Sequence, residues 1–414
     1  MDCPYETEWR RAYTPLTAME EASRCLLCED APCSADCPAG TDPGRFIRSI
    51  RFLNDEGAAA TILSNNALGD VCARVCPTER YCERRCTRAE VDRPIDIKGL
   101  QRFATDFAAA LSMEVLEAGP DTGRSVAVVG SGPGALQAAA TLRRMGHAVD
   151  VYERDTVAGG MLAHGIPAYR LPDDVVAAAV SRIERLGAKV HTGVRVGAGC
   201  AVTCQGLLED HDALLVDVGF SAGKTIPIFD GDPAVELAVD FLARVRAAEG
   251  EVTVPDNVLV IGGGDVAMDV STTLKRLGAR TVTDVVWEES DAFLASEEEL
   301  AGARGAGVTL VDGYAPVAAD GGVVTFRHRV IDAELTVRAD LVILAVGQRA
   351  DVCGLDIDLE LDGNEVAGGG PATSVPRVFV TGDLMAGDKT VVWAVRKGKM
   401  AAAAIDGMFE KGGE

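Results

Sequence analysis

The sequence predicts an α/β protein with two Rossmann-like dinucleotide-binding domains, one inserted in the other, preceded by an α-helical domain. Three observations lead to this fold class. The same glycine motif follows a short apolar run twice, an acidic residue ends the strand after each motif, and nine of the twelve cysteines precede residue 87. A chain of 414 residues has room for two or three domains.

The first motif lies in residues 125–153, SVAVVGSGPGALQAAATLRRMGHAVDVYE. The β-branched apolar run predicts a buried strand, and the stretch rich in Ala and Leu predicts a helix that Gly146 ends. Between them, the G-x-G-x-x-A turn consists of Gly130, Ser131, Gly132, Pro133, Gly134 and Ala135. Such a turn brings backbone N–H groups against a pyrophosphate, and Glu153 can accept hydrogen bonds from a ribose. The motif therefore predicts a bound dinucleotide.

The second motif lies in residues 257–269, NVLVIGGGDVAMD. It repeats the order of strand, glycine turn and helix, and its turn contains Gly262, Gly264 and Ala267. Two such motifs in one chain indicate two dinucleotide sites.

The strand after the second motif ends at Glu288 and Glu289. A carboxylate at this position suits the ribose 2′-OH of NAD, whereas the 2′-phosphate of NADP requires an arginine. Because no arginine lies between Arg280 and Arg304, the second site is predicted to bind NAD. The alternative is that an arginine from elsewhere in the chain reaches this site.

The N-terminal cysteines form two spaced groups. The first is Cys25-x2-Cys28-x4-Cys33-x3-Cys37-Pro38, and the second is Cys76-Pro77-x4-Cys82-x3-Cys86, with Cys72 one turn upstream. A run of four cysteines followed by proline is typical of ferredoxins, so two [4Fe–4S] clusters are predicted. Zinc is the alternative, but only one C-x2-C pair is present. Two clusters need eight ligands, and by counting alone Cys72 is the eighth.

The C-terminal part of the sequence returns to the first domain. Its strands and the sequence Thr381-Gly382-Asp383 are followed by a long helix, and Asp383 is placed to bind the ribityl chain of a flavin. We therefore predict a helical iron–sulfur domain, an FAD domain in two pieces and an inserted NAD domain. Their ranges are 1–122, then 123–224 with 339–414, and 225–338.

Composition excludes several classes of function. A net charge of −23 and an isoelectric point of about 4.7 argue against binding to nucleic acid or an anionic membrane. No apolar run is long enough to cross a bilayer, and the first ten residues lack the features of a secretion signal. We therefore expect a cytoplasmic protein whose cysteines bind metal or do redox chemistry.

Taken together, the motifs resemble one family over nearly the full chain. The stretches that carry the resemblance are EASRCLLCEDAPCSADCPAGTDPGRFIRSIRF, NNALGDVCARVCPTERYC, GIPAYRLP, IGGGDVAMD, ILAVGQ and GDKTVVWAVRKGK. They resemble the PreT-type subunits of bacterial NAD-dependent dihydropyrimidine dehydrogenases. The architecture is also similar to the N-terminal half of the fused eukaryotic enzyme and, more distantly, to the small subunit of glutamate synthase.

The resemblance implies two [4Fe–4S] clusters with crossed ligation. One cluster would be held by Cys25, Cys28, Cys33 and Cys86, and the other by Cys37, Cys76, Cys82 and Gln101. Gln101, within GLQRF, falls on the unusual glutamine ligand of the family. On this reading Cys72 is structural, contrary to the count above.

The resemblance also implies FAD at the first motif and NAD at the second. The implied FAD contacts, besides the turn 130–135, are Glu153, Gly160, Met161, Arg170, Gly382, Asp383, Thr390 and Val391. The implied NAD contacts are Gly262, Gly264, Asp265, Val266, Ala267, Glu288 and Gly347.

The function implied is that of an electron-input subunit. It would oxidise NADH through FAD and pass electrons over its clusters to a PreA-like partner with FMN and Fe–S clusters, which reduces uracil or thymine reversibly. No residue resembles an acid or base for a pyrimidine, so we expect a hetero-oligomer. One alternative is the same module serving a glutamate synthase large subunit or a ferredoxin. Another is a flavoprotein disulfide reductase or redox sensor with a zinc-bound N-terminal domain.

Overall fold

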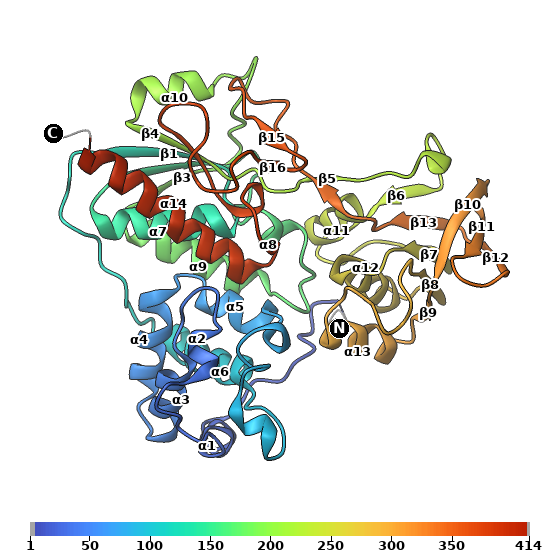
Figure 1. The fold of residues 1–414 in the computed structure, drawn as a ribbon, viewed down its shortest axis with the longest axis horizontal. Helices are drawn as coiled ribbons and strands as arrows, with labels where there is room; N and C mark the ends of the chain where they lie inside the picture. The colour runs from blue at the N-terminus through green and yellow to red at the C-terminus, as the bar shows by residue number, and fades with distance from the viewer. Residues whose placement is uncertain (1–4, 412–414) are drawn as a thin grey trace. The chain divides into compact units, whose positions relative to one another are not determined.

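The fold of the chain is given by a computed structural model that describes residues 5–411 (Figure 1). These residues form two compact units, which we name after the motif that each contains. The first-motif unit comprises residues 10–163, 173–219 and 350–411, and the second-motif unit comprises residues 5–9, 164–172 and 220–349.

The first-motif unit is built on a parallel five-stranded sheet in the order β17-β4-β1-β2-β3. Its strands are β1 (Ser125–Val129), β2 (Ala148–Tyr152), β3 (Lys189–His191), β4 (Ala213–Val216) and β17 (Val378–Val380). Its helices are α7 (Pro133–Met145), α8 (Met161–His164), α9 (Asp173–Arg185), α10 (Cys204–Asp210), η4 (Gly382–Leu384) and α14 (Val391–Lys411). The C-terminal helix α14 packs along α7, so the predicted return of the chain to the first sheet is present.

The helical domain belongs to the same unit. It consists of α1 (Pro15–Ser23), α2 (Pro32–Ala35), α3 (Pro43–Arg51), α4 (Asp55–Asn65), α5 (Gly69–Val75), η1 (Thr78–Arg80), η2 (Thr87–Glu90) and α6 (Ile97–Ala110). Side-chain oxygens of Asp42, Asn54 and Asp96 accept backbone N–H groups and so begin α3, α4 and α6. Burial of Phe46 and Ile50 against the other helices stabilises the domain.

Polar contacts join this domain to helices α7 and α9, which pack in the same unit. The Ala67 N–H donates to Gln137 Oε1 on α7 over 3.0 Å, and Arg182 on α9 pairs with Asp70 at 2.8 Å. The domain that holds the cysteines is therefore fixed to the domain that holds the first motif.

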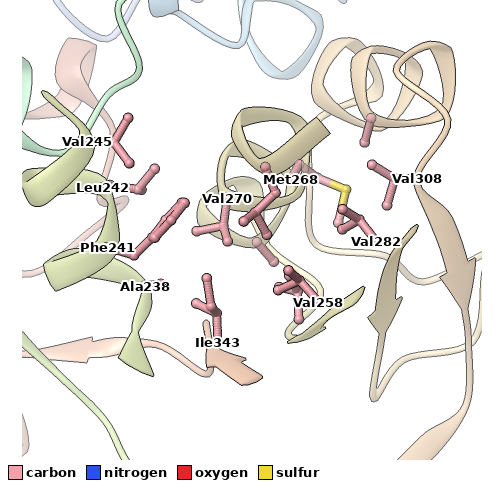
Figure 2. Packing of buried hydrophobic residues seen from close by; sticks show 14 of the residues in the cluster. Ala238, Phe241, Leu242, Val245, Val258, Met268, Val270, Val282, Val308 and Ile343 are labelled. Carbon is pink, nitrogen blue, oxygen red and sulfur yellow. The ribbon is translucent and has the colours of Figure 1, made fainter. Parts of the chain in front are cut away.

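The second-motif unit contains another parallel five-stranded sheet, in the order β6-β13-β7-β8-β9. Its strands are β6 (Val235–Leu237), β7 (Asn257–Ile261), β8 (Thr281–Val285), β9 (Thr309–Val311) and β13 (Leu341–Leu344). Its helices are η3 (Pro227–Phe229), α11 (Ala238–Ala247), α12 (Asp265–Arg276) and α13 (Glu297–Gly305). Figure 2 shows the core between sheet and helices, where Val258 and Ile343 meet Met268 and Phe241.

Three smaller antiparallel sheets complete the fold of the described residues. β10 (Tyr314–Asp320), β11 (Val323–His328) and β12 (Glu334–Arg338) form one sheet. β5 (Ala222–Gly223) pairs with β14 (Gln348–Arg349), and β15 (Leu361–Asp362) pairs with β16 (Glu365–Val366). Among residues 5–411, no helix is both long and apolar enough to cross a bilayer.

The units differ from the predicted domain ranges in two places. β13 pairs with β6 and β7 in the second sheet, so the inserted segment extends to Arg349 and does not end at 338. A buried apolar strand fits either sheet, and its sequence does not name its partners. Residues 5–9 and 164–172 also belong to the second-motif unit, where the Trp9 N–H donates to the Tyr169 carbonyl over 3.1 Å.

One buried carboxyl in the second sheet gives a test of the fold. Asp284 on β8 is fully buried, its Oδ2 accepts the Ser271 hydroxyl at 3.2 Å, and its Oδ1 has no hydrogen-bond partner. Burial raises the pKa of Asp284 to about 8. In the folded protein Asp284 therefore keeps a proton that it loses near pH 4 in the unfolded chain. As a result, the free energy of unfolding declines as the pH rises from about 4 to about 8.

We expect Asp284→Asn to weaken this decline, because an amide has no proton to lose. Thermal unfolding midpoints would be measured from about pH 5 to pH 8.5. The midpoint of the variant minus that of the wild type should become more positive as the pH rises. Asp291→Asn, at an exposed aspartate of the same unit, should follow the wild type. A constant difference between Asp284→Asn and wild type at every pH would contradict the expectation.

Candidate functional site

The first-motif turn has the geometry that a dinucleotide requires. Gly130 has φ +96°, and an added Cβ would lie 2.1 Å from the Asp217 carbonyl oxygen, so only glycine fits there. Gly132 precedes the first turn of α7, and no side chain caps the helix at this position. Backbone N–H groups at the start of α7 therefore face the place where an anion would bind.

Several predicted FAD residues converge on this turn. The Glu153 carboxylate at the end of β2 accepts the backbone N–H of Ser131 at 3.0 Å. The loop before α8 lies against the turn, because a Cβ on Gly160 would be 3.0 Å from the Gly132 Cα. From the C-terminal side, the Gly382 nitrogen would be 2.8 Å from a Cβ on Gly134. The structure thus brings together segments that are 250 residues apart in sequence.

Residues around η4 and the start of α14 complete this cradle. Asp383 is partly buried, and burial raises the pKa of its carboxyl while the Lys397 and Lys389 ammonium groups oppose the rise. Two buried polar atoms nearby in sequence, Thr381 Oγ1 and Trp393 Nε1, have no hydrogen-bond partner among the described residues. Unpartnered buried donors and acceptors are costly unless a ligand satisfies them, so the cradle fits a bound polar group such as a flavin dinucleotide.

Arg170, a predicted FAD contact, makes ion pairs within the second-motif unit. Its guanidinium lies in the second-motif unit, where it contacts both Asp269 oxygens at 2.6 and 2.8 Å and Glu299 at 2.5 Å. The side chain is almost entirely buried, and the two carboxylates raise the pKa of Arg170 against the effect of burial. Both terminal nitrogens thus bind carboxylates of the protein, and the contact of Arg170 with FAD stays a prediction.

The structure brings cysteines of the two spaced groups near one another, and their division between two clusters stays a prediction. Burial raises the pKa of Cys33 to about 11, and the neighbouring thiols of Cys86 and Cys25 add to the rise. Burial likewise raises the pKa of Cys76, with the thiols of Cys72, Cys82 and Cys37 adding to it. Soft thiol donors grouped in this way suit iron–sulfur clusters.

These cysteines are unpaired and are not grouped as the ligands of a single metal ion are. All cysteines within residues 5–411 are free thiols. In that range no three histidine, cysteine, aspartate or glutamate side chains converge on a point as ligands of one metal ion do. In a [4Fe–4S] cluster each protein ligand binds a different iron, so its ligands surround a cube of atoms.

Gln101 and Cys72 remain the two candidates for the eighth ligand. On α6, the Gln101 amide nitrogen donates to the Gly69 carbonyl at 2.7 Å, which leaves its oxygen Oε1 as the atom for metal binding. Cys72 is buried, and its sulfur accepts the Asn66 amide at 3.4 Å. Burial raises the pKa of Cys72 to about 12, with the Cys37 thiol adding to it. Cys72 also neighbours the Cys76 thiol, so these contacts do not decide between Cys72 and Gln101.

Helix α14 contacts both the flavin cradle and the cysteine domain. The Tyr81 hydroxyl, next to Cys82, donates to Asp388 at 2.8 Å and lies 3.3 Å from the Thr390 hydroxyl. Further along the helix, Lys399 Nζ donates to the Ala39 carbonyl at 2.7 Å, two residues after Cys37. The predicted FAD residues Thr390 and Val391 therefore lie at the end of a helix that is anchored beside two cluster ligands. Sequence reasoning did not single out Tyr81 or Lys399.

The second-motif turn places its predicted NAD residues between β7 and α12. The Glu288 carboxylate lies against this turn, because a Cβ on Gly263 would be 2.5 Å from Glu288 Oε2. Asp265, the first residue of α12, accepts the Ser296 N–H at 2.6 Å. Gly347 follows β13, and its carbonyl accepts the Lys224 N–H at 3.0 Å.

The structure also brings an arginine to this region that the sequence argument did not find. Arg329, just after β11, lies with its guanidinium carbon 4.3 Å from the centre of the Trp287 ring. Its Nη1 also donates to the Trp287 carbonyl at 3.1 Å. Arg329 is 41 residues from Glu288 in sequence, outside the stretch from which an arginine was excluded. The prediction of NAD from the sequence therefore rests on the Glu288 carboxylate and not on the lack of any nearby arginine.

Comparisons with known proteins agree with both halves of this arrangement. Residues 5–113 match the family described as dihydropyrimidine dehydrogenase domain II, 4Fe-4S cluster, and residues 124–404 match pyridine nucleotide-disulphide oxidoreductase. The chain is 51% identical over 406 residues to the NAD-dependent dihydropyrimidine dehydrogenase subunit PreT of Escherichia coli O157:H7, covering 98% of each chain. It is 48% identical to the PreT subunit of Salmonella typhimurium strain LT2, again over 98% of each chain.

Among solved structures, the fold is similar to that of Mycobacterium tuberculosis FprA in complex with NADPH. The two align with a TM-score of 0.58 at 18% identity, covering 70% of this chain and 86% of that chain. At this level of identity the likeness supports the fold of the nucleotide-binding part.

The eighth cluster ligand can be identified by substitution. We expect Gln101→Ala to change the electron paramagnetic resonance of one reduced cluster, because that iron loses its protein oxygen ligand. Cys72→Ala should keep about eight irons per chain and both wild-type signals. The reverse result, with loss of iron in Cys72→Ala and unchanged spectra in Gln101→Ala, would make Cys72 the ligand.

The preference between nicotinamide nucleotides can be tested at Glu288. We expect Glu288→Gln to tighten binding of NADPH relative to NADH by roughly tenfold, because it removes the carboxylate that repels a 2′-phosphate. Dissociation constants for both nucleotides would be measured by titration. Glu297→Gln, at an exposed glutamate of the same unit, is the matched control. An unchanged ratio in Glu288→Gln would show that another group determines the preference.

Proposed function

Because the chain belongs to the family of PreT subunits of NAD-dependent dihydropyrimidine dehydrogenase, we propose that it is the NADH-oxidising, electron-input subunit of such an enzyme. FAD binds at the first motif, NAD(H) at the second, and two [4Fe–4S] clusters in the helical domain. The domain division is the predicted one, with the inserted NAD domain extended to Arg349. The protein acts in the cytoplasm.

The observation that supports this role best is the position of α14. Its first turn contributes to the flavin cradle, and Lys399 on the same helix binds the backbone beside Cys37. Tyr81 makes a second such link, from beside Cys82 to Thr390. A rigid helix shared by the two sites fixes the separation between flavin and cluster, which is what stepwise electron transfer requires.

The residues of the chain hold and orient the redox groups. When bound, FAD and the clusters supply the redox chemistry, which includes dividing an electron pair into single electrons. The first-motif turn and the start of α7 bind the flavin diphosphate, and Glu153 binds its ribose. Glu288 selects and orients the ribose of NADH at the second motif. The seven predicted cysteine ligands and Gln101 hold the clusters.

Substrate chemistry is assigned to a partner subunit. Neither nucleotide site contains a residue with a recognisable role as acid or base toward a pyrimidine. We therefore propose a hetero-oligomer with a PreA-like subunit that carries FMN and further Fe–S clusters. That subunit reduces the 5,6 bond of uracil or thymine reversibly, with electrons delivered by this chain.

A role as a disulfide reductase is less well supported. Such an enzyme needs an exposed thiol of low pKa beside the flavin. Burial and the neighbouring Asp356 carboxylate raise the pKa of Cys204 to about 12, which makes it a poor nucleophile. A thiol in this state fits a structural role.

The proposal is tested on the anaerobically purified chain. We expect about eight irons per chain, one FAD, and rapid bleaching of the flavin and cluster absorbance on addition of NADH. Adding a PreA-like subunit with uracil should restore the oxidised spectrum and produce dihydrouracil. Zinc in place of iron, or a flavin that NADH does not reduce, would contradict the electron-input function. Reoxidation by a glutamate synthase large subunit, but not by the PreA-like subunit, would assign a different partner.

A further inference from the structure

The carboxyl group of Asp217 lies inside the predicted flavin cradle. Asp217 follows the last residue of β4, and its Oδ2 accepts the Ala135 N–H over 2.6 Å in the first turn of α7. Only 6% of the residue is exposed. One of the backbone donors at the start of α7 is therefore already used by a carboxylate of the protein.

Glycines on three sides make room for this carboxyl group. A Cβ on Gly382 would lie 2.1 Å from Asp217 Oδ1, and Cβ atoms on Gly132 or Gly134 would each lie 3.0 Å from Oδ2. Contacts this short exclude a larger residue at Gly382. The backbone that approaches a diphosphate in this fold thus also encloses an acidic side chain.

The charged groups around Asp217 come from three elements. Asp383 on η4 and Glu153 at the end of β2 are acidic, and Lys397 on α14 is basic. Lys397 is itself committed, since its Nζ donates to the carbonyls of Met385 and Asp388 at 3.0 and 3.1 Å. Burial raises the pKa of Asp217 to about 7, with Asp383 and Glu153 adding to the rise and the Ala135 N–H and Lys397 opposing it.

A diphosphate at this turn would add further negative charge beside the carboxyl group. Two anions in a buried site repel strongly unless one of them is neutralised. A protonated carboxyl keeps the hydrogen bond from Ala135 through its carbonyl oxygen and gains an O–H that can donate. Only the neutral form is compatible with a neighbouring phosphate.

We propose that Asp217 is a positioning residue of the flavin cradle that carries a proton whenever FAD is bound, so that its ionisation weakens FAD binding. This inference rests on the proposed binding of FAD at the first motif. Below neutral pH the carboxyl is already protonated, and binding needs no proton. Above neutral pH, the binding of FAD must be accompanied by uptake of one proton, so the affinity for FAD falls by up to about tenfold per pH unit.

The experiment measures FAD release from the holoprotein. Flavin fluorescence after dilution gives the dissociation constant from about pH 6 to pH 8.5 at constant ionic strength. We expect the wild-type constant to be flat at the acid end and to rise above about pH 7. Asp217→Asn should give a flat profile and bind FAD roughly tenfold more tightly than wild type at pH 8.5, because the amide is neutral at every pH.

Asp284→Asn is the matched control, since Asp284 is also a buried aspartate of raised pKa but belongs to the second sheet. It should keep the wild-type profile. A wild-type profile without a rise, or a rise that persists in Asp217→Asn, would overturn the inference.

A second measurement covers the case in which Asp217→Asn does not fold. Calorimetric titration of FAD-depleted wild type at pH 8, in buffers of different ionisation enthalpy, should show uptake of about one proton per FAD. Binding without proton uptake would overturn the inference and leave the proposed function standing. A chain that binds no FAD at any pH would instead contradict the proposed function.

Discussion

The packing of α14 along α7 is the contact on which the first-motif unit depends. α7 carries the first glycine turn at its N-terminus, and α14 begins beside Gly382 and Asp383. Close approach of the helices is possible because a Cβ on Gly398 would lie 2.4 Å from the Gly134 carbonyl oxygen. Through Lys399, α14 then reaches the loop after Cys37. One helix pair thus fixes the flavin cradle and one of the cysteine neighbourhoods together.

Much of this organisation follows from local sequence pattern. Each glycine turn between a strand and a helix is found where the motif predicts it, and Glu153 and Glu288 lie against their turns. The thiols of Cys33 and Cys86 are neighbours in the structure, while the crossed ligation that the family resemblance implied stays a prediction. The glycine turns were predictable because a few residues that are close together in sequence determine each of them.

Features that depend on tertiary packing were not predictable in the same way. β13 has the composition of any buried strand, so the sequence did not identify its sheet. Arg329 reaches Trp287 from a separate hairpin, which a search along one stretch of sequence does not detect. The surroundings of Asp217, which follows β4, were not predictable either, because Ala135 and Gly382 are 82 and 165 residues away from it in sequence.

The buried group of Arg170, Asp269 and Glu299 has a consequence for how the sequence can diverge. Losing Arg170 leaves two buried carboxylates without their cation, which costs about 3–5 kcal/mol in comparable cases, whereas losing one carboxylate leaves an ion pair. Replacing all three by apolar residues of similar volume is often neutral. The effect of each substitution therefore depends on the other two positions, which is strong epistasis. Loss of Arg170 ahead of the carboxylates is selected against, so descendants of this chain are expected to keep Arg170 for as long as they keep Asp269 and Glu299.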